Sequence, residues 1–255
     1  MNGLLTALRF LTVIPIPDKG RVNPESIGES LPFFPVVGIL IGLILAHINW
    51  ILLFLLPSSI VNALLIISSS AISGFLHLDG FIDTCDGMAG HKTPDERLKI
   101  MKDTHVGAFG VIGGILLILL KYVSLNSLSG SVLTRALLLS PILSRWGTVF
   151  AIYAFPSARS EGLGRTFKDG ATGSTFIIAT VITLAATAIS GGLAGLFIYT
   201  GVLGIVMVFA SHLKSKLTGL TGDSYGAINE IAEVSVFILA AILTKINLIN
   251  LFSFI

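Results

Sequence analysis

Charged residues are scarce in this chain, and their scarcity decides its class. Only 12% of the 255 residues are Asp, Glu, Lys or Arg, whereas about 25% is usual in a soluble domain. The hydrophobic fraction is 53%, and the mean hydropathy is +0.92. This composition excludes an ordinary soluble protein and predicts a polytopic membrane protein. The first residues also lack the pattern of a cleavable signal peptide, so we expect none.

Cysteine is almost absent as well. Cys85 is the only one in the sequence, which excludes an internal disulfide. A free cysteine usually packs as a small apolar residue, so we interpret Cys85 as a filler rather than a nucleophile.

Long apolar stretches dominate what is there. A membrane span needs about 20 apolar residues, and seven stretches qualify: 31–56, 62–78, 106–125, 131–155, 174–190, 192–211 and 227–249. No repeat or second domain is visible. We therefore predict an all-α transmembrane bundle of about seven spans that forms a single integral-membrane domain over residues 1–255.

The loops between these stretches are of two kinds. Those at 57–61, 126–130 and 191–192 carry no charge. The others hold most of the basic residues, namely Arg9, Lys19, Arg21, Lys92, Arg97, Lys99, Lys102, Arg159, Arg165, Lys168, Lys214 and Lys216. The positive-inside rule places these basic loops and the amino terminus in the cytoplasm. Acidic residues fall on the same side or at its boundary, with midspans nearly free of them. We therefore expect the chemistry at the cytoplasmic face of the cytoplasmic (inner) membrane.

The segment His-Leu-Asp-Gly-Phe-Ile-Asp-Thr-Cys-Asp-Gly at 77–87 carries the strongest functional signal. Asp79, Asp83 and Asp86 are spaced i, i+4, i+7, which puts three carboxylates on one helical face. Like charges at that spacing repel, but oxygen ligands of this kind suit Mg²⁺. We expect Gly80 and Gly87 to leave room for a phosphate, and His77 either to assist at the site or to be an ordinary satisfied polar residue.

The next segment is mixed in charge. Thr93 and Glu96 form a predicted capping box for a short surface helix. Arg97 and Lys102 suit a phosphorylated substrate because ionised donors bind phosphate strongly, although they also suit a solvated amphipathic helix. Asp103 is a candidate fourth metal ligand.

Several further residues have two readings. Gly107 and Gly110 open the following span, where close helix packing is the default interpretation and anion binding the alternative. Arg145 lies near midspan and is expected to pair with an acid or a substrate phosphate. We expect Lys121 to snorkel toward the outer edge of the membrane.

A second acidic stripe begins near residue 223. Asp223 and Glu230 are seven residues apart, on one helical face, and Glu233 follows one turn later. Two acidic clusters on one side of the membrane suit two metal ions, or one ion shared between helices. Arg159, in the preceding basic loop, either contacts phosphate or merely sets the topology.

Taken together, these blocks resemble the cobalamin synthase family of adenosylcobinamide-GDP ribazoletransferases. The blocks are the 77–87 segment, Ile-Met-Lys-Asp at 100–103 with its following glycines, Arg-Ser-Glu-Gly-Leu-Gly at 159–164, and Leu-Thr-Gly-Asp-x-x-Gly-Ala-x-x-Glu at 220–230. The opening Arg-Phe-Leu-Thr-x-Ile-Pro-Ile-Pro at 9–17 matches too. The resemblance thus covers nearly the whole chain.

The resemblance implies that adenosylcobinamide-GDP and α-ribazole, or its 5′-phosphate, join with release of GMP, assisted by Mg²⁺. Negative charge grows on the leaving GMP, and cations stabilise it. The expected roles are metal binding for Asp79, Asp83, Asp86 and Asp103, diphosphate binding for Arg97, Lys102, Arg145 or Arg159, and proton acceptance for Asp223 or Glu230.

Two alternatives stay open. A CDP-alcohol-type lipid phosphotransferase also uses Asp and Gly on a membrane helix, but the Ala-Arg typical of its motif is missing after Asp79-Gly80. A cation-coupled transporter would place its acids near the bilayer midplane. As partners we expect small-molecule substrates and the lipid bilayer, with no nucleic acid. Whether the chain forms a homo-oligomer stays open.

Overall fold

The described part of the chain is entirely helical. The computed structural model describes residues 2–16 and 27–248, in which no strand forms. Lys19 and Arg21 lie outside the described residues. The helices are α1 (Asn2–Leu11), the short 3₁₀ helix η1 (Leu31–Phe33), α3 (Phe34–Leu52), α4 (Ser58–Ile72), α5 (Leu76–Met88), α6 (Pro94–Ile100), α7 (Ala108–Asn126), α8 (Gly130–Ala154), α9 (Leu163–Gly170), α10 (Gly173–Leu217) and α11 (Gly222–Lys245).

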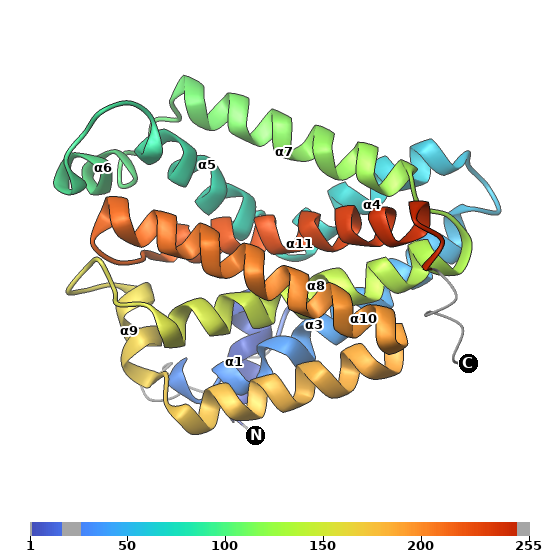
Figure 1. Cartoon of the computed structure of the whole chain (residues 1–255). Helices are drawn as coiled ribbons and strands as arrows, with labels where there is room; N and C mark the ends of the chain where they lie inside the picture. The colour runs from blue at the N-terminus through green and yellow to red at the C-terminus, as the bar shows by residue number, and fades with distance from the viewer. Residues whose placement is uncertain (1, 17–26, 249–255) are drawn as a thin grey trace.

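The predicted multi-pass bundle is confirmed. Five helices are long and apolar enough to cross a membrane, and the bent pair α4–α5 makes a sixth candidate. The 45-residue α10 is two helices joined at Gly192, whose backbone is non-helical. A Cβ on Gly195 would lie 2.8 Å from the carbonyl oxygen of Thr187, whereas eight residues of straight helix span about 12 Å. The two halves of α10 therefore fold back on each other (Figure 1), which brings the count to the predicted seven.

Helix α8 forms the centre of the bundle. Of its most apolar stretch, 83% is buried, and α3, α10 and α11 pack against it. A helix that is buried on nearly every side in this way belongs inside a bundle. In contrast, α7 lies at the edge in Figure 1 and exposes apolar side chains such as Ile112, Ile115 and Leu119. These residues form a surface suited to lipid.

The chain turns by 90° between α4 and α5. Gly74 and Phe75 both have positive φ, at 61° and 59°, a conformation that breaks a helix. The expected single stretch 62–78 was wrong in this respect, because α4 ends at Ile72. The break allows α5, which carries the acidic motif, to run in its own direction.

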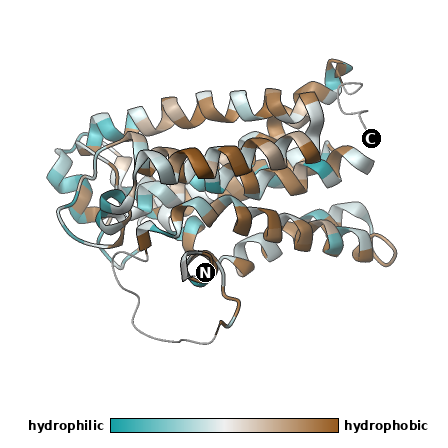
Figure 2. Ribbon diagram, turned by 90° about the horizontal axis from the view of Figure 1, so that it is seen from below, coloured by the Kyte–Doolittle hydropathy of each residue, from teal (hydrophilic) through white to brown (hydrophobic). Residues whose placement is uncertain are grey.

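The polar elements gather at one end of the bundle. Figure 1 places α6, α9 and the first turn of α11 there, and Figure 2 shows hydrophilic residues concentrated at that end. The capping box predicted at the start of α6 is confirmed, since Glu96 N donates to Thr93 Oγ1 and Thr93 N to Glu96 Oε2. The motifs singled out in the sequence therefore meet at, or just inside, a single end.

Candidate active site

Helices α5 and α11 approach each other closely enough for their backbones to touch. A Cβ on Gly80 would lie 2.8 Å from the carbonyl oxygen of Asp223, and one on Gly226 would lie 3.1 Å from that of His77. Glycine is therefore required at this contact. The expectation that Gly80 leaves room for phosphate was wrong, and so was that for Gly87, which packs on the side chain of Met101.

This contact gathers the acids of the two helices. Asp79, Asp86 and Asp223 all lie close enough to Asp83 for their charges to repel it. Asp79 is exposed and Asp83 half-buried, so both carboxylates remain accessible. The i, i+4, i+7 spacing does place its three aspartates on one helix, α5. Asp223, six helices later in the sequence, joins them from the first turn of α11.

A short backbone bridge brings Arg159 to this cluster. Ala158 N donates to Leu220 O at 2.8 Å, and Leu220 N donates to Pro156 O at 2.8 Å. The residue after this bridge, Arg159, then lies 3.3 Å from Asp223 (Nη2 to Oδ2). The basic loop after α8 is thus joined to the start of α11, and its arginine faces the acids.

Asp86 has a different environment from the other acids. Its two oxygens accept hydrogen bonds at 2.8 Å from the backbone N–H groups of Gly107 and Gly110, at the start of α7. These N–H groups are therefore already occupied by a protein anion. A Cβ on Gly113 would lie 2.6 Å from Cys85 Sγ. The default interpretations, close packing for the glycines and a filler role for Cys85, fit this interface.

Arg97 is buried and binds backbone rather than open space. Its guanidinium donates to the carbonyl oxygens of Gly87 and Gly90, both at 2.8 Å, and of Lys92 at 3.2 Å. It therefore holds the turn between α5 and α6. Because these carbonyl oxygens occupy the guanidinium of Arg97, it is not free to make the expected phosphate contact. Lys102, the other basic residue predicted in this segment, is exposed at the surface.

Asp103 stands apart from the acidic cluster. It is exposed, and hydrogen bonds from the backbone and ring of His105 lower its pKa. Across residues 2–16 and 27–248, no three His, Cys, Asp or Glu side chains form a ready-made metal cage. Any cation at this site would therefore depend on one or two carboxylates at a time, with the remaining ligands from elsewhere.

A pocket of about 240 Å³ opens beside the acids. Polar groups of His77, Asp79, Arg159, Asp223 and Tyr225 line one wall. His77 Nε2 and Tyr225 Oη are buried there and have no hydrogen-bond partner in the described structure. Sequence reasoning missed Tyr225, although its position two residues after an acid in Gly-Asp-Ser-Tyr-Gly could have indicated it.

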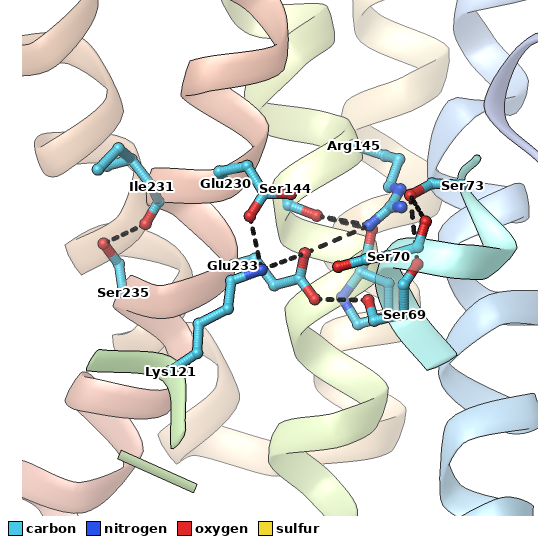
Figure 3. Close-up of polar contacts among 11 residues, drawn as sticks. Ser69, Ser70, Ser73, Lys121, Ser144, Arg145, Glu230, Ile231, Glu233 and Ser235 are labelled. Atoms are coloured by element: carbon cyan, nitrogen blue, oxygen red, sulfur yellow. Dashed lines mark hydrogen bonds and ion pairs between the residues drawn. The ribbon is translucent and has the colours of Figure 1, made fainter. Parts of the chain in front are cut away.

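The second acidic stripe splits between two places. Asp223 lines the pocket, whereas Glu230 and Glu233 lie two to three turns further along α11, about 10–15 Å by helical rise. Lys121 Nζ lies 2.7 Å from Glu230 and 3.4 Å from Glu233, and Arg145 lies 4.0 Å from Glu233 (Figure 3). We call these four residues the buried quartet.

The quartet corrects two expectations and agrees with a third. Lys121 is only 3% exposed and does not snorkel. The expectation that the midspans are nearly free of acids is wrong, because Glu230 and Glu233 lie within α11. Arg145, as expected, pairs with an acid and not with open space, and Glu233 also accepts a hydrogen bond from Ser69 Oγ at 2.9 Å.

Comparison with known proteins identifies the family. A family model described as cobalamin-5-phosphate synthase matches residues 3–241. The chain belongs to the cobalamin-5-phosphate synthase family. This match spans the acidic motif, the Arg159 loop and the start of α11, which the structure brings together.

Individual relatives agree along most of their length. An adenosylcobinamide-GDP ribazoletransferase of Roseiflexus sp. is 37% identical over 89% of this chain and 85% of its own. Enzymes of the same name from Geotalea daltonii (36% identical, covering 89% and 92%) and Herpetosiphon aurantiacus (37% identical, covering 96% and 98%) are similar to it. No solved structure matches the chain. Membership in this family makes the chain an enzyme of the transferase class.

Proposed function

We propose that the chain joins adenosylcobinamide-GDP to α-ribazole or its 5′-phosphate and releases GMP. The single observation that carries this proposal is the full-length family match over residues that converge on one pocket. In the reaction, a ribose hydroxyl oxygen attacks the phosphorus next to the cobinamide side chain. The new P–O bond forms as the bond to GMP breaks, and the hydroxyl proton passes to a protein base.

The pocket favours one candidate base over the other. Asp223 lines the pocket, whereas Glu230 is buried against Lys121. A base must come within hydrogen-bond reach of the proton it removes, so we assign that role to Asp223. Arg159, beside it, is the side chain placed to bind the diphosphate, because ionised donors bind phosphate oxygens strongly. His77 Nε2 is a further contact for substrate.

The acidic cluster fits the divalent ion that the family implies. Mg²⁺ commonly binds through one or two carboxylates, substrate phosphates and water, without a full protein cage. Asp79 and Asp83 present accessible oxygens that repel each other, and we propose them as the ligands. When bound, the ion would stabilise charge on the transferring phosphoryl group. Asp86 supports them through α7 in place of direct binding, and Asp103, which is bonded to His105 and is not among the acids whose charge acts on Asp83, is not a proposed ligand.

We place this site at the cytoplasmic face of the cytoplasmic membrane. The proposal depends on the positive-inside rule and on the basic loops around α6 and α9, which lie at the end of the bundle that holds the acids. Both substrates are small molecules, and no nucleic acid is involved.

The rival functions lose support for different reasons. The family match runs against a CDP-alcohol-type phosphotransferase. The buried quartet supplies midspan acids of the kind a cation-coupled transporter uses, but each acid there already has a basic partner within 4.0 Å. Uptake of labelled cation into proteoliposomes would support the transporter.

The test compares three proteins in membranes. Wild type, Asp83→Asn and Asp103→Asn are incubated with adenosylcobinamide-GDP, α-ribazole 5′-phosphate and Mg²⁺, at equal expression. We expect product from wild type and from Asp103→Asn, whose carboxylate is exposed and bonded to His105, and loss of product in Asp83→Asn. Absence of product in wild type would contradict the proposed function, and full activity in Asp83→Asn would remove the acidic motif from it.

A further inference from the structure

The pocket has a second wall of opposite character. Six apolar side chains line it: Phe10, Leu11, Phe34, Ile152, Leu163 and Phe167. They come from α1, α3, α8 and α9, whereas the polar wall is built by α5, α11 and the Arg159 loop. Thr148 of α8 and Arg165 of α9 also line the pocket, so a molecule there meets mainly charged groups on one side and mainly hydrocarbon on the other.

Three aromatic rings meet in the apolar wall. The centroids of Phe10 and Phe167 lie 4.7 Å apart, those of Phe34 and Phe167 lie 5.6 Å apart, and those of Phe10 and Phe34 lie 6.1 Å apart. Phe34 is 0% and Phe167 only 3% exposed, so these two rings hold half-buried Phe10 in place, and Phe10 is the ring that presents surface to the pocket. Rings at these distances prefer tilted or offset partners, and a flat ligand ring is such a partner.

We propose that this apolar wall is the subsite for the base of the nucleoside substrate, and that it accepts a flat ring with an apolar edge rather than guanine. The inference rests on the proposed function, whose two substrates offer the site different rings. The base of α-ribazole is a benzimidazole with an apolar edge. Guanine presents an acceptor at O6 and a donor at N2 on its edge.

The composition of the apolar wall decides between the two rings. Leu163, which is 57% exposed, and half-buried Phe10 offer most of the apolar surface and have no side-chain donor or acceptor, so the polar edge of guanine would be left unpaired against them. An apolar pocket rejects a ring with added polar groups only moderately, by up to about a hundredfold, which sets the scale of the expected preference. The volume also limits the occupant, because 240 Å³ lies below the usual range of ligand sites, roughly 300–1,000 Å³. A corrinoid does not fit within it.

This placement also orients the sugar. With the base against the phenylalanines, the ribose lies toward Asp223 and Arg159 on the opposite wall. The attacking hydroxyl would then face the proposed base, and adenosylcobinamide-GDP would approach from outside the pocket.

Binding to the wild-type protein provides the first test. Purified protein in detergent is dialysed to equilibrium against α-ribazole or guanosine, each without the second substrate. We expect α-ribazole to bind at least about tenfold more tightly, a difference of one decade in Kd. Equal or tighter binding of guanosine would overturn the assignment. This measurement needs no turnover, so it tests the preference for the apolar ring even where the proposed function fails, and dialysis of α-ribazole against the Phe10→Leu variant then tests whether the apolar wall is the source of that preference.

Steady-state kinetics of three variants provides the second test. Phe10→Leu and Phe167→Leu each replace one aromatic ring of the apolar wall with an aliphatic side chain. Phe176→Leu is the matched control, because Phe176 stacks on Tyr153 at 4.7 Å, outside the pocket. We expect both pocket variants to raise KM for α-ribazole 5′-phosphate several-fold and to leave KM for adenosylcobinamide-GDP unchanged. The control should change neither.

The outcomes separate the subsite from the reaction. A rise in KM for adenosylcobinamide-GDP alone would show that the apolar wall serves the other substrate, while product formation would keep the proposed function. Where a pocket variant unfolds, the dialysis on wild type still tests the preference for the apolar ring. An unchanged KM for both substrates in folded pocket variants would overturn the subsite.

Discussion

Replacing Lys121 with methionine tests whether the buried quartet holds the bundle together. The side chain is 3% exposed, and its ammonium contacts Glu230 at 2.7 Å and Glu233 at 3.4 Å. Two basic and two acidic groups balance in the quartet, so the substitution leaves one carboxylate without a partner. Breaking a buried pair in this way costs about 3–5 kcal/mol. For a chain of this size that loss corresponds to about 6–20 °C in the midpoint of thermal unfolding.

A double substitution sharpens this prediction. In Lys121→Met with Glu230→Met, the remaining Glu233 keeps Arg145 at 4.0 Å and Ser69 at 2.9 Å. Charge balance is restored, and well-packed apolar residues replace buried ion pairs with little loss. We therefore expect the double variant to regain at least half of the lost stability.

The assay is thermal unfolding in detergent, followed by loss of the monodisperse peak in size-exclusion chromatography. Lys102→Met serves as the control because Lys102 is exposed and should leave the midpoint unchanged. A Lys121→Met protein as stable as wild type, or a double variant no more stable than the single one, would refute the reasoning.

Three further predictions concern the interfaces around the acids. Gly80→Ala places a Cβ 2.8 Å from the carbonyl oxygen of Asp223, so α5 and α11 must separate and activity should fall sharply; Gly204→Ala, with open space around it, should remain active. Asp86→Ala removes the acceptors at the start of α7, and loss of such a cap costs about 1 kcal/mol. Faster amide hydrogen exchange at residues 107–110 would show the loss of this cap, and unchanged exchange would contradict the capping role of Asp86. Arg97→Lys cannot reproduce the fork that binds three carbonyl oxygens, so limited proteolysis should cut faster between α5 and α6; a wild-type cleavage rate would contradict this role.

The elements of the fold could be predicted because they depend on local sequence. Apolar length predicted the spans, the spacing of Asp79, Asp83 and Asp86 predicted one helical face, and Thr93 with Glu96 predicted a cap. Each of these signals concerns residues a few positions apart. Periodicity reports such short-range relations well.

The partners across helices could not be predicted in the same way. Lys121 and Glu230 are more than one hundred residues apart, and a pattern along one helix does not say which other helix it meets. The same limit hid the role of Gly80, which depends on the backbone of α11, and of Arg97, whose three acceptors are carbonyl groups that no side-chain motif records. Tyr225 was missed because a tyrosine in an apolar helix is ordinary until its hydroxyl is found buried and unpaired beside a pocket.

The most direct test of the account is the Mg²⁺ dependence of GMP release in wild type and in Asp79→Asn. Adenosylcobinamide-GDP and α-ribazole 5′-phosphate are held at saturating concentration while Mg²⁺ is titrated after chelation. If Asp79 helps to hold the ion, the half-saturating Mg²⁺ concentration should rise by about tenfold or more in the variant, a change of about 1.4 kcal/mol. An identical Mg²⁺ titration in the two proteins, or GMP release that persists in the chelator, would contradict the metal role of the α5 acids.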